Sequence, residues 1–209
     1  VLSWYVKRFR VKQKFLFFPI IQKDQDFRLL LENALPVSKI LEDTYHLEGR
    51  QVLLFVGRLI DIKNLFFLLD ALALVVNRYP KVILLFVGDG DQRVALERHA
   101  ERNGLADHVI FAGKKQGKDL YACYNVGQIF VLPSYYERFG AVVNEALLAG
   151  CYTLCSSAAG AACLVNPLEN GAIFDSHSKD GLVEQLTVAL DMTPVLSELR
   201  LKENKMLNS

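Results

Sequence analysis

The stretch LLFVG occurs twice in the chain, at residues 53–57 and again at residues 84–88. Each copy is a run of large apolar residues that stops at a glycine, and each precedes a segment with helical spacing. Strands that are apolar at every position are typical of a parallel sheet with both faces covered. The copies lie about 30 residues apart, which is the length of one strand–helix unit. We interpret them as two buried strands of similar composition rather than as a true repeat.

The alternation of strand and helix continues along the chain. A helix is predicted over residues 64–78, which stops before Pro80 because the residue before proline avoids helical angles. The helix after the second strand is predicted to have Asp91 as its N-cap and Gly104 as its stop. Further strands are predicted at residues 108–113, 128–133, 151–156 and 172–174, and further helices at residues 120–125, 140–149 and 179–190. This alternation predicts an α/β fold with a Rossmann-like, doubly wound parallel sheet.

The first 48 residues differ from the rest. The segment WYVKRFRVKQKFLFF, residues 4–18, has five basic residues and no acid, and Pro19 and a polar helical stretch follow it. We expect residues 1–48 to be a linker or an edge segment, and residues 49–209 to form the ligand-binding domain. A membrane-surface or partner-binding arm is the alternative for the first segment.

The composition is that of a globular domain. Of the 209 residues, 52% are apolar and 22% are charged, which is enough to build a core. The formal net charge is +1, which argues against a nucleic-acid binder because such a protein needs a basic surface. No apolar run reaches the length of about 18 residues that a membrane helix needs. Because the chain begins with Val1 rather than Met, we expect a fragment of a longer protein.

The four cysteines lie in apolar stretches, and no pair of them has the C-x-x-C spacing of a zinc site. We therefore expect reduced, buried thiols at Cys123, Cys151, Cys155 and Cys163, and no bound zinc. Reduced thiols are typical of a reducing compartment, so a cytoplasmic location is the default.

Charged residues follow the first predicted strand. Ligands of open parallel sheets bind beyond the carboxyl ends of the strands, where the segment GRLIDIKN, residues 57–64, places Arg58 and Lys63. Two cations close to a helix N-terminus favour an anion, because the free backbone N–H groups point the same way. A diphosphate is the natural occupant. The alternative is a solvated loop with two ordinary surface cations.

The stretch ERFGAVVNEALLAG, residues 137–150, places seven residues between Glu137 and Glu145. A helix that begins near Gly140 leaves Glu137 in the loop and Glu145 about one turn inside the helix. Ionised carboxylates only accept hydrogen bonds, and sugar hydroxyls donate them. Two acids beside a diphosphate site therefore suit a nucleotide sugar, with the ribose at one end and the hexose at the other. The alternative makes Glu145 a helix-surface acid and Glu137 a cap.

Several segments, taken in order, resemble the carboxyl-terminal half of retaining GT-B glycosyltransferases. The specific resemblance is to the large family 4, whose signature is two glutamates with seven residues between them. The resemblance covers residues 50–190 and is carried by LLFVGRLIDIKN, LLFVGDGD, VIFAG, VLPSYYERFGAVVNEALLAG and ENGAIF. It implies that residues 49–209 form the nucleotide-sugar-binding domain of such an enzyme.

The resemblance also implies a role for each residue at the strand ends. Arg58 and Lys63 would hold the donor diphosphate and stabilise the departing nucleoside diphosphate. Glu145 would accept from the ribose hydroxyls and Glu137 from the transferred sugar, so the expected catalytic residues are Arg58, Lys63 and Glu137. The other expected donor-binding residues are Gly57 and Gly88 at the strand ends, Gly113 and Lys114 at the edge of the base pocket, and Phe139 and Gly140, whose backbone N–H groups would contact sugar or phosphate.

The partners implied by the resemblance are a UDP-, GDP- or ADP-sugar donor and a glycan or lipid-linked acceptor. No metal cofactor is expected, because Arg58 and Lys63 supply the positive charge. The acceptor half comes first in such enzymes, so we expect a missing N-terminal acceptor domain upstream of Val1. The isolated chain is then inactive in transfer, and the parent protein makes a peripheral contact with the cytoplasmic face of a membrane.

The chain departs from the family pattern at two places. Arg138 stands where the family usually has a glycine after the first glutamate. Residues 159–163, AGAAC, lack the glutamate of the common Gly-Gly-x-x-Glu pattern. Both departures concern contacts to the donor sugar, and neither touches the phosphate or ribose sites.

Three other functions fit parts of the sequence. A dinucleotide dehydrogenase needs a third glycine where GDGDQR, residues 88–93, has Arg93, and its glycine-rich turn follows the first strand rather than the second. A metal-dependent GT-A transferase needs a D-x-D pair, which Asp89 and Asp91 match, but we expect Asp91 to be an N-cap. A non-catalytic binding or scaffolding domain of the same fold is the remaining alternative, and it would tolerate the loss of Glu145.

Overall fold

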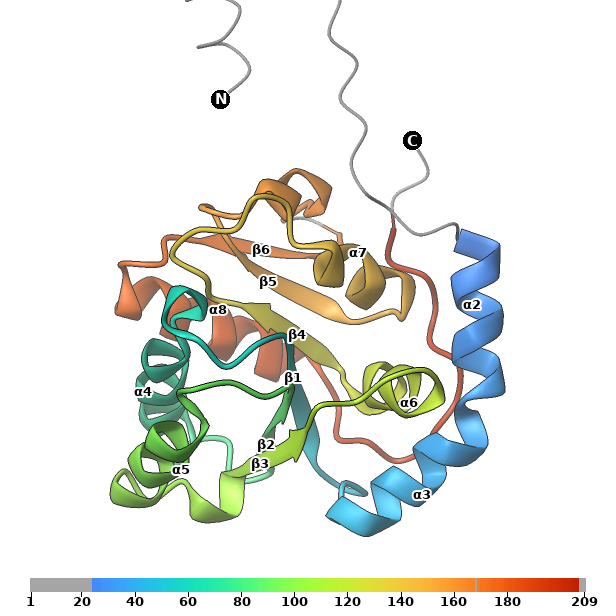
Figure 1. The fold of residues 1–209 in the computed structure, drawn as a ribbon, viewed down its shortest axis with the longest axis horizontal. Coiled ribbons are helices and arrows are strands. Elements are labelled where there is room, and N and C mark those ends of the chain that lie inside the picture. The colour runs from blue at the N-terminus through green and yellow to red at the C-terminus, as the bar shows by residue number, and fades with distance from the viewer. Residues whose placement is uncertain (1–23, 168, 207–209) are drawn as a thin grey trace, which may run out of the picture.

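The computed structural model describes residues 24–167 and 169–206, and a parallel six-stranded sheet forms the centre of this part of the chain (Figure 1). The strands are β1 (Gln51–Val56), β2 (Val82–Val87), β3 (Val109–Gly113), β4 (Ile129–Leu132), β5 (Tyr152–Ser156) and β6 (Gly171–Phe174). Their order in the sheet is β3-β2-β1-β4-β5-β6. Strands β1 to β3 are added one after another toward one edge of the sheet. The chain then crosses back to the other side of β1, and β4 to β6 are added toward the opposite edge. This order confirms the predicted α/β fold with a Rossmann-like, doubly wound sheet.

Helices cover both faces of the sheet (Figure 1). One face carries α4 (Leu65–Val75), α5 (Arg93–Arg102) and α8 (Lys179–Met192). The other face carries α2 (Asp24–Asn33), α3 (Leu35–Tyr45), α6 (Lys118–Val126) and α7 (Ala141–Leu148). Three short 3-10 turns, η1 (Asp61–Lys63), η2 (Ala106–His108) and η3 (Gly160–Leu164), lie in the connections.

Strands β1 and β2 are buried at every position, as their apolar LLFV stretches predict, and β1 also buries the polar Gln51 at its start. They pair in parallel with Leu53 opposite Leu84. The rings of Phe55 and Phe86 lie 5.7 Å apart between centroids, and Phe86 stacks on Phe111 of β3 at 5.1 Å. Fully burying one such side chain contributes about 1.5–3 kcal/mol. The two LLFVG stretches are therefore central strands of one hydrophobic core.

The start of α5 differs from the prediction. Asp91 is not the N-cap: Gln92 takes that position, and no side chain caps the helix. A tertiary contact determines the boundary, because the Gln92 N–H donates to the carbonyl of Leu59 at 3.1 Å. Gly104, with φ of 70°, follows the end of the helix as predicted.

Helices α2 and α3 pack against α6 and α7, which places residues 24–45 on the domain. Phe27 and Leu31 of α2 are buried in the same core as the strands. Arg28 donates to the carbonyl of Leu148, at the end of α7, at 3.0 Å. The basic stretch at residues 4–18 lies outside the described residues, and the domain boundary predicted at residue 49 stays a prediction.

The C-terminal segment returns from α8 past α6 to α2 (Figure 1). Lys202 is partly buried there, and its ammonium donates to the carbonyls of Tyr124 at 2.9 Å, of Asn125 at 2.8 Å and of Gly127. These carbonyls end helix α6, where a cation compensates the helix dipole. Burial lowers the pKa of Lys202. The segment thus anchors the C-terminal end of α6.

Candidate active site

The loops that follow β1 and β4 meet at the carboxyl edge of the sheet. These strands are neighbours, although β2 and β3 separate them in sequence, and their connections lead to helices on opposite faces. Open α/β sheets bind ligands at such a switch point. Two backbone carbonyls accept hydrogen bonds between these loops: the Tyr135 N–H donates to the Ile62 carbonyl at 3.0 Å, and the buried Asn64 amide donates to the Pro133 carbonyl at 3.2 Å.

Lys63 and Glu137 contact each other at this switch point. The Lys63 Nζ donates to Glu137 Oε2, and the two side chains are 15% and 22% exposed. Gly57 lies beside the lysine: a Cβ at Gly57 would be 3.8 Å from Lys63 Cε. A Cβ at Gly140 would be 3.1 Å from Glu137 Cγ, so the missing side chain makes room for the glutamate. Four predicted site residues are therefore neighbours in space.

Arg58 lines a cavity of about 380 Å³ across the ends of β1, β2 and β3. The cavity combines glycines, cations and apolar side chains, and its lining is Val56, Gly57, Arg58, Val87, Gly88, Asp89, Lys114, Lys115 and Leu120. The Arg58 side chain is exposed and has no ion-pair or hydrogen-bond partner within residues 24–167 and 169–206. Its guanidinium is therefore available to a ligand. Small-molecule sites in proteins typically have volumes of about 300–1,000 Å³.

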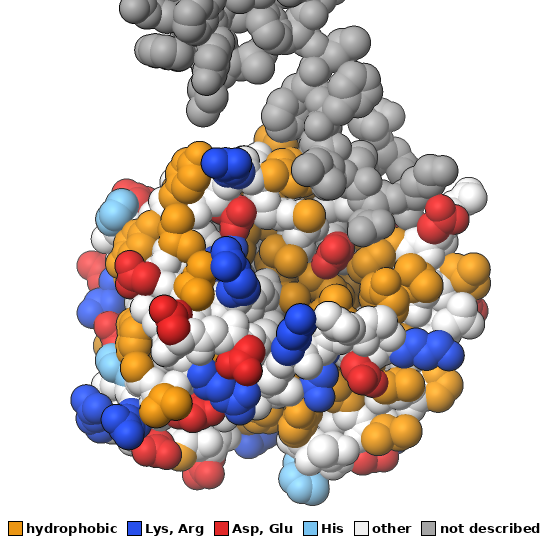
Figure 2. Space-filling view, in the orientation of Figure 1, with side chains coloured by type: hydrophobic (Ala, Val, Ile, Leu, Met, Phe, Trp, Pro, Cys, Tyr) orange, Lys and Arg blue, Asp and Glu red, His pale blue; other side chains and the backbone are white. Residues whose placement is uncertain are grey.

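The two predicted cations thus differ in their surroundings. Arg58 belongs to the open cavity, whereas Lys63 shares its charge with Glu137. An ammonium has three N–H donors, so the pairing leaves Lys63 with two. Figure 2 shows the face that carries these loops, with basic and acidic side chains side by side across its middle.

Three predicted glycines join neighbouring strand ends. The Gly57 N–H donates to the Val87 carbonyl, and the Gly88 N–H donates to the Gly113 carbonyl, both at 2.9 Å. A Cβ at Gly88 would lie 1.8 Å from the Gly57 carbonyl oxygen, so a larger residue requires the backbone to move. Gly113, with φ of 72°, leads directly into Lys114, which lines the cavity, and the role of both residues at the edge of a base pocket stays a prediction.

Glu145 lies on α7, and its carboxylate contacts helix α6. The Tyr124 hydroxyl donates to Glu145 Oε2 at 2.6 Å. Tyr124 is fully buried, and burial together with the Glu145 carboxylate raises its pKa well above the usual value. The phenol therefore remains a donor. Tyr124 could not be found from the sequence, because it lies 21 residues before Glu145 on a different helix and no local pattern links the two.

The segment that departs from the family pattern supports the loop of Glu137. The Gly160 N–H donates to the Glu137 carbonyl at 3.0 Å, and the Ala161 N–H donates to the Phe139 carbonyl at 2.6 Å. A Cβ at Gly160 would lie 2.3 Å from the Arg138 carbonyl oxygen. The backbone of this segment therefore holds the loop in place, although its side chains supply no acid.

Phe139 and Gly140 stand at the start of α7. Gly140 is the N-cap with φ of 92°, and Phe139 is partly buried. Across residues 24–167 and 169–206, we find no hydrogen bond donated by the backbone N–H of either residue. Free N–H groups at a helix start attract anions and hydroxyl oxygens. Their contacts to a sugar or phosphate stay a prediction.

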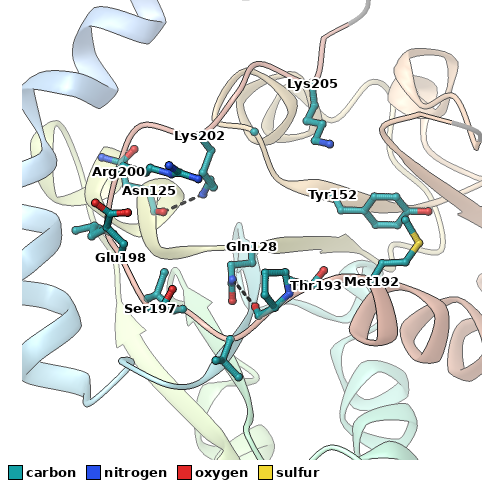
Figure 3. A pocket seen from close by; sticks show the side chains of 15 residues that line it. Asn125, Gln128, Tyr152, Met192, Thr193, Ser197, Glu198, Arg200, Lys202 and Lys205 are labelled. Atoms are coloured by element: carbon teal, nitrogen blue, oxygen red, sulfur yellow. Dashed lines mark hydrogen bonds between the residues drawn. The ribbon is translucent and has the colours of Figure 1, made fainter.

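A second cavity, of about 350 Å³, lies at the opposite edge of the sheet (Figure 3). Its walls include Gln128 and Tyr152, at the amino ends of β4 and β5, and much of the C-terminal segment from Met192 to Lys205. Lys202 lines this cavity, and its ammonium donates hydrogen bonds to backbone carbonyls, including that of Asn125. None of the predicted site residues lines this cavity.

The prediction of four buried thiols is confirmed for three cysteines and wrong for the fourth. Cys123, Cys151 and Cys155 are buried, but Cys163 is exposed, because it lies in the surface turn η3. None of the four forms a disulfide. Burial raises the pKa of Cys123 and Cys155 to about 12, so both are neutral thiols at physiological pH.

In the described part of the chain, no group of three or more His, Cys, Asp and Glu side chains is arranged to hold a metal ion. Nor does any helix there combine the length and the hydrophobicity needed to cross a membrane.

A doubly wound parallel sheet with a cation-lined cavity at its carboxyl edge defines the class, a Rossmann-like α/β domain. The family follows from comparison with known proteins. The model of the family Glycosyl transferases group 1 matches residues 38–206, and the chain belongs to this family. The resemblance predicted from the sequence is confirmed.

Individual relatives agree with this assignment. An uncharacterized glycosyltransferase from Methanocaldococcus jannaschii is 33% identical over 124 residues, which are 59% of this chain and 32% of that protein. WaaG, a glycosyltransferase involved in lipopolysaccharide biosynthesis, has a similar structure, with a TM-score of 0.75 at 22% identity over 91% of this chain and 51% of WaaG. HepE of Anabaena, solved in complex with UDP, gives a TM-score of 0.70 at 25% identity over 78% of this chain and 45% of HepE. The chain spans about a third of the curated relative and about half of the solved structures.

Proposed function

We propose that this chain is the donor-binding domain of a retaining glycosyltransferase, which transfers a hexose from a nucleoside-diphosphate sugar to a glycan or lipid-linked acceptor. The observation that carries the proposal is that the Arg58 cavity and the Lys63–Glu137 pair lie next to each other at the carboxyl edge of the sheet, with Gly57 between them. The Anabaena relative supports it, since that protein was solved with UDP and also with UDP and glucose.

In this proposal the base of the nucleotide occupies the cavity. Val56, Val87 and Leu120 give the cavity apolar surface, and Gly113 and Lys114 stand at its edge. A flat aromatic ring binds well against apolar side chains with a few polar groups at the rim. The ribose hydroxyls donate to Glu145, which is half-buried on α7.

The diphosphate lies between the cavity and the Lys63–Glu137 pair. Arg58 offers a planar fork of donors, and Lys63 offers the two donors that its pairing with Glu137 leaves. When the bond to the sugar breaks, the departing diphosphate gains negative charge, which fixed cations stabilise. Side chains thus supply the countercharge, and we propose that no metal cofactor is required.

The hexose lies over Glu137 and the start of α7. Glu137 accepts a hydrogen bond from a sugar hydroxyl while Lys63 holds its other side. The free N–H groups of Phe139 and Gly140 contact the sugar or the phosphate next to it. The sugar end of the site is therefore the part that distinguishes a nucleotide sugar from a bare nucleotide.

The acceptor site belongs to a second domain upstream. Holding donor and acceptor in one geometry lowers the barrier by about 7–11 kcal/mol, and a lone donor domain cannot supply that orientation. The isolated chain should therefore hydrolyse its donor slowly at most. We place the parent protein in the cytoplasm, with a peripheral membrane contact where its acceptor is lipid-linked.

Calorimetric titration of the chain with UDP, GDP and ADP, with and without EDTA, tests the donor site. We expect weak binding of at least one nucleotide, unchanged by EDTA. Binding that requires a metal would contradict the proposed source of the countercharge, and failure of all three nucleotides would contradict the donor site itself.

A labelled-donor assay tests the division into domains. The chain and its longer parent are compared with the same pool of acceptors, and the anomeric configuration of the product is read by NMR. We expect transfer with retention from the parent alone. Transfer by the chain at the parent's rate would show that the acceptor site lies within these residues.

A further inference from the structure

Tyr124 contacts Glu145 from within the core. Its hydroxyl donates to Glu145 Oε2 at 2.6 Å, a short distance typical of an O–H group bonded to a carboxylate. The tyrosine is fully buried, and its ring packs near Phe27 of α2 and Phe130 of β4, with centroids 6.2 and 6.5 Å away. Contacts with α2, β4 and α7 therefore hold the side chain in place.

The direction of the side chain explains how it reaches Glu145. Tyr124 lies near the C-terminal end of α6, at the amino edge of the sheet. Helical side chains lean toward the N-terminus of their helix, so the hydroxyl lies closer to the ligand-binding edge than its own Cα does. Glu145 lies in the second turn of α7, which starts at that edge. The contact thus connects the buried core to a residue of the site.

We propose that Tyr124 is a positioning residue for nucleotide recognition: its hydroxyl holds one carboxylate oxygen of Glu145 and so orients the carboxylate toward the ribose hydroxyls. The inference rests on the proposed function, since it takes the ribose to be the partner of Glu145. Tyr124 itself touches no substrate.

The chemistry of the phenol suits this role. A tyrosine hydroxyl has one hydrogen, and a donor that stays protonated keeps that hydrogen directed at the carboxylate. The raised pKa of Tyr124 means that the hydroxyl does not ionise near neutral pH. A glutamate side chain has several rotatable bonds, and ordering it on binding costs conformational entropy. Tyr124 orders one end of Glu145 before the nucleotide arrives.

The substitution Tyr124→Phe tests the proposal, because it removes the hydroxyl and keeps the ring. The chain is titrated with UDP, GDP and ADP, and the nucleotide that binds best is then compared with its 2′,3′-dideoxy form. We expect the wild type to prefer the ribonucleotide. Tyr124→Phe should weaken the ribonucleotide about five- to tenfold, the effect of about one hydrogen bond, and leave the dideoxy form unchanged.

Tyr121→Phe is the matched control. Tyr121 lies one turn earlier on α6 and also packs on Phe27, with centroids 5.5 Å apart. Within the structurally described residues, its hydroxyl has no hydrogen-bond partner. We expect this control to bind both nucleotides like the wild type. A purely structural role for Tyr124 would instead weaken both nucleotides equally, and that result would overturn the proposal.

A double-mutant cycle with Glu145→Gln shows whether Tyr124 acts through Glu145. We expect Tyr124→Phe to have little further effect in the Glu145→Gln background, since coupled residues are non-additive. Additive losses would overturn the proposal while leaving the proposed function intact. If the wild type bound none of the three nucleotides, the proposed function would fail, and this inference with it.

Discussion

Lys63 and Glu137 contact each other at the switch point between β1 and β4, where the order of the strands reverses. Lys63 follows β1, Glu137 follows β4, and the two residues are 74 positions apart in the sequence. Both side chains are largely buried, so the cost of removing the two charges from water offsets much of their attraction, and the pair is weak evidence for stability. Its consequence is positional: the cation expected beside the diphosphate and the acid expected beside the sugar are held in one geometry before a donor binds.

The first prediction concerns the acid of this pair. Glu137→Gln should leave the affinity for a bare nucleoside diphosphate within about twofold and weaken the matching nucleotide sugar about tenfold, since a charge-assisted hydrogen bond contributes about 1.5–3 kcal/mol. The measurement is a calorimetric titration of the variant with UDP and UDP-glucose, or with the corresponding pair for the preferred base. Glu184→Gln, at an exposed acid on α8, is the control. An equal loss for both ligands would refute the assignment of Glu137 to the sugar.

The second prediction concerns the unpaired cation. Arg58→Ala should weaken nucleoside diphosphate binding about tenfold or more, because one charge-assisted contact to phosphate is lost. The midpoint of thermal unfolding should not change, since the Arg58 side chain is exposed. Arg98→Ala, at an exposed arginine of α5, is the control and should alter neither quantity. Unchanged binding after Arg58→Ala would place the phosphate elsewhere.

The third prediction concerns the close approach of two strand ends. Gly88→Ala should lower the free energy of unfolding by at least about 3 kcal/mol, because its Cβ would lie 1.8 Å from the Gly57 carbonyl oxygen. Gly104→Ala should cost only about 1–2 kcal/mol, since Gly104 has φ of 70° but open space around the position of its Cβ. Denaturant titration measures both changes. Equal costs would mean that backbone conformation, and not the approach to Gly57, determines the need for glycine.

The fourth prediction concerns thiol reactivity. Iodoacetamide should modify the folded chain at Cys163 alone, because the other three cysteines are buried. Since the thiolate is the reactive form, Cys123 and Cys155, with pKa values of about 12, should stay unmodified even at about pH 9. Mass spectrometry of peptides from the labelled protein measures the sites. Cys163→Ser should abolish labelling until denaturant is added, and labelling of a buried cysteine in the native variant would contradict the structure.

Much of the fold could be predicted from local patterns. The apolar stretches at residues 53–57 and 84–88 form β1 and β2, and the later strands and helices follow in the predicted order. The switch-point rule also placed Arg58, Lys63 and Glu137 at one edge of the sheet. These predictions succeed because burial on both faces requires apolar residues at every position, and that requirement is visible within a few consecutive residues.

Contacts between distant segments could not be predicted in the same way. The sequence placed Arg58 and Lys63 in one loop, but only the structure shows that, among the residues it describes, Lys63 has an ion-pair partner and Arg58 has none. The start of α5 at Gln92, rather than at Asp91, depends on the carbonyl of Leu59. No local sequence pattern indicates the packing of α2 on the domain or the contact of Tyr124 with Glu145.

The sequence alone therefore determined which segments are strands and helices, and which residues follow the strand ends. The tertiary structure decided which of those residues meet. Secondary structure depends on periodicity and turn residues that are neighbours along the chain, whereas the pairs Lys63–Glu137 and Tyr124–Glu145 depend on the strand order β3-β2-β1-β4-β5-β6. That order is set by the packing of the whole core, because each strand and helix must bury its apolar surface against others that lie far from it in the sequence.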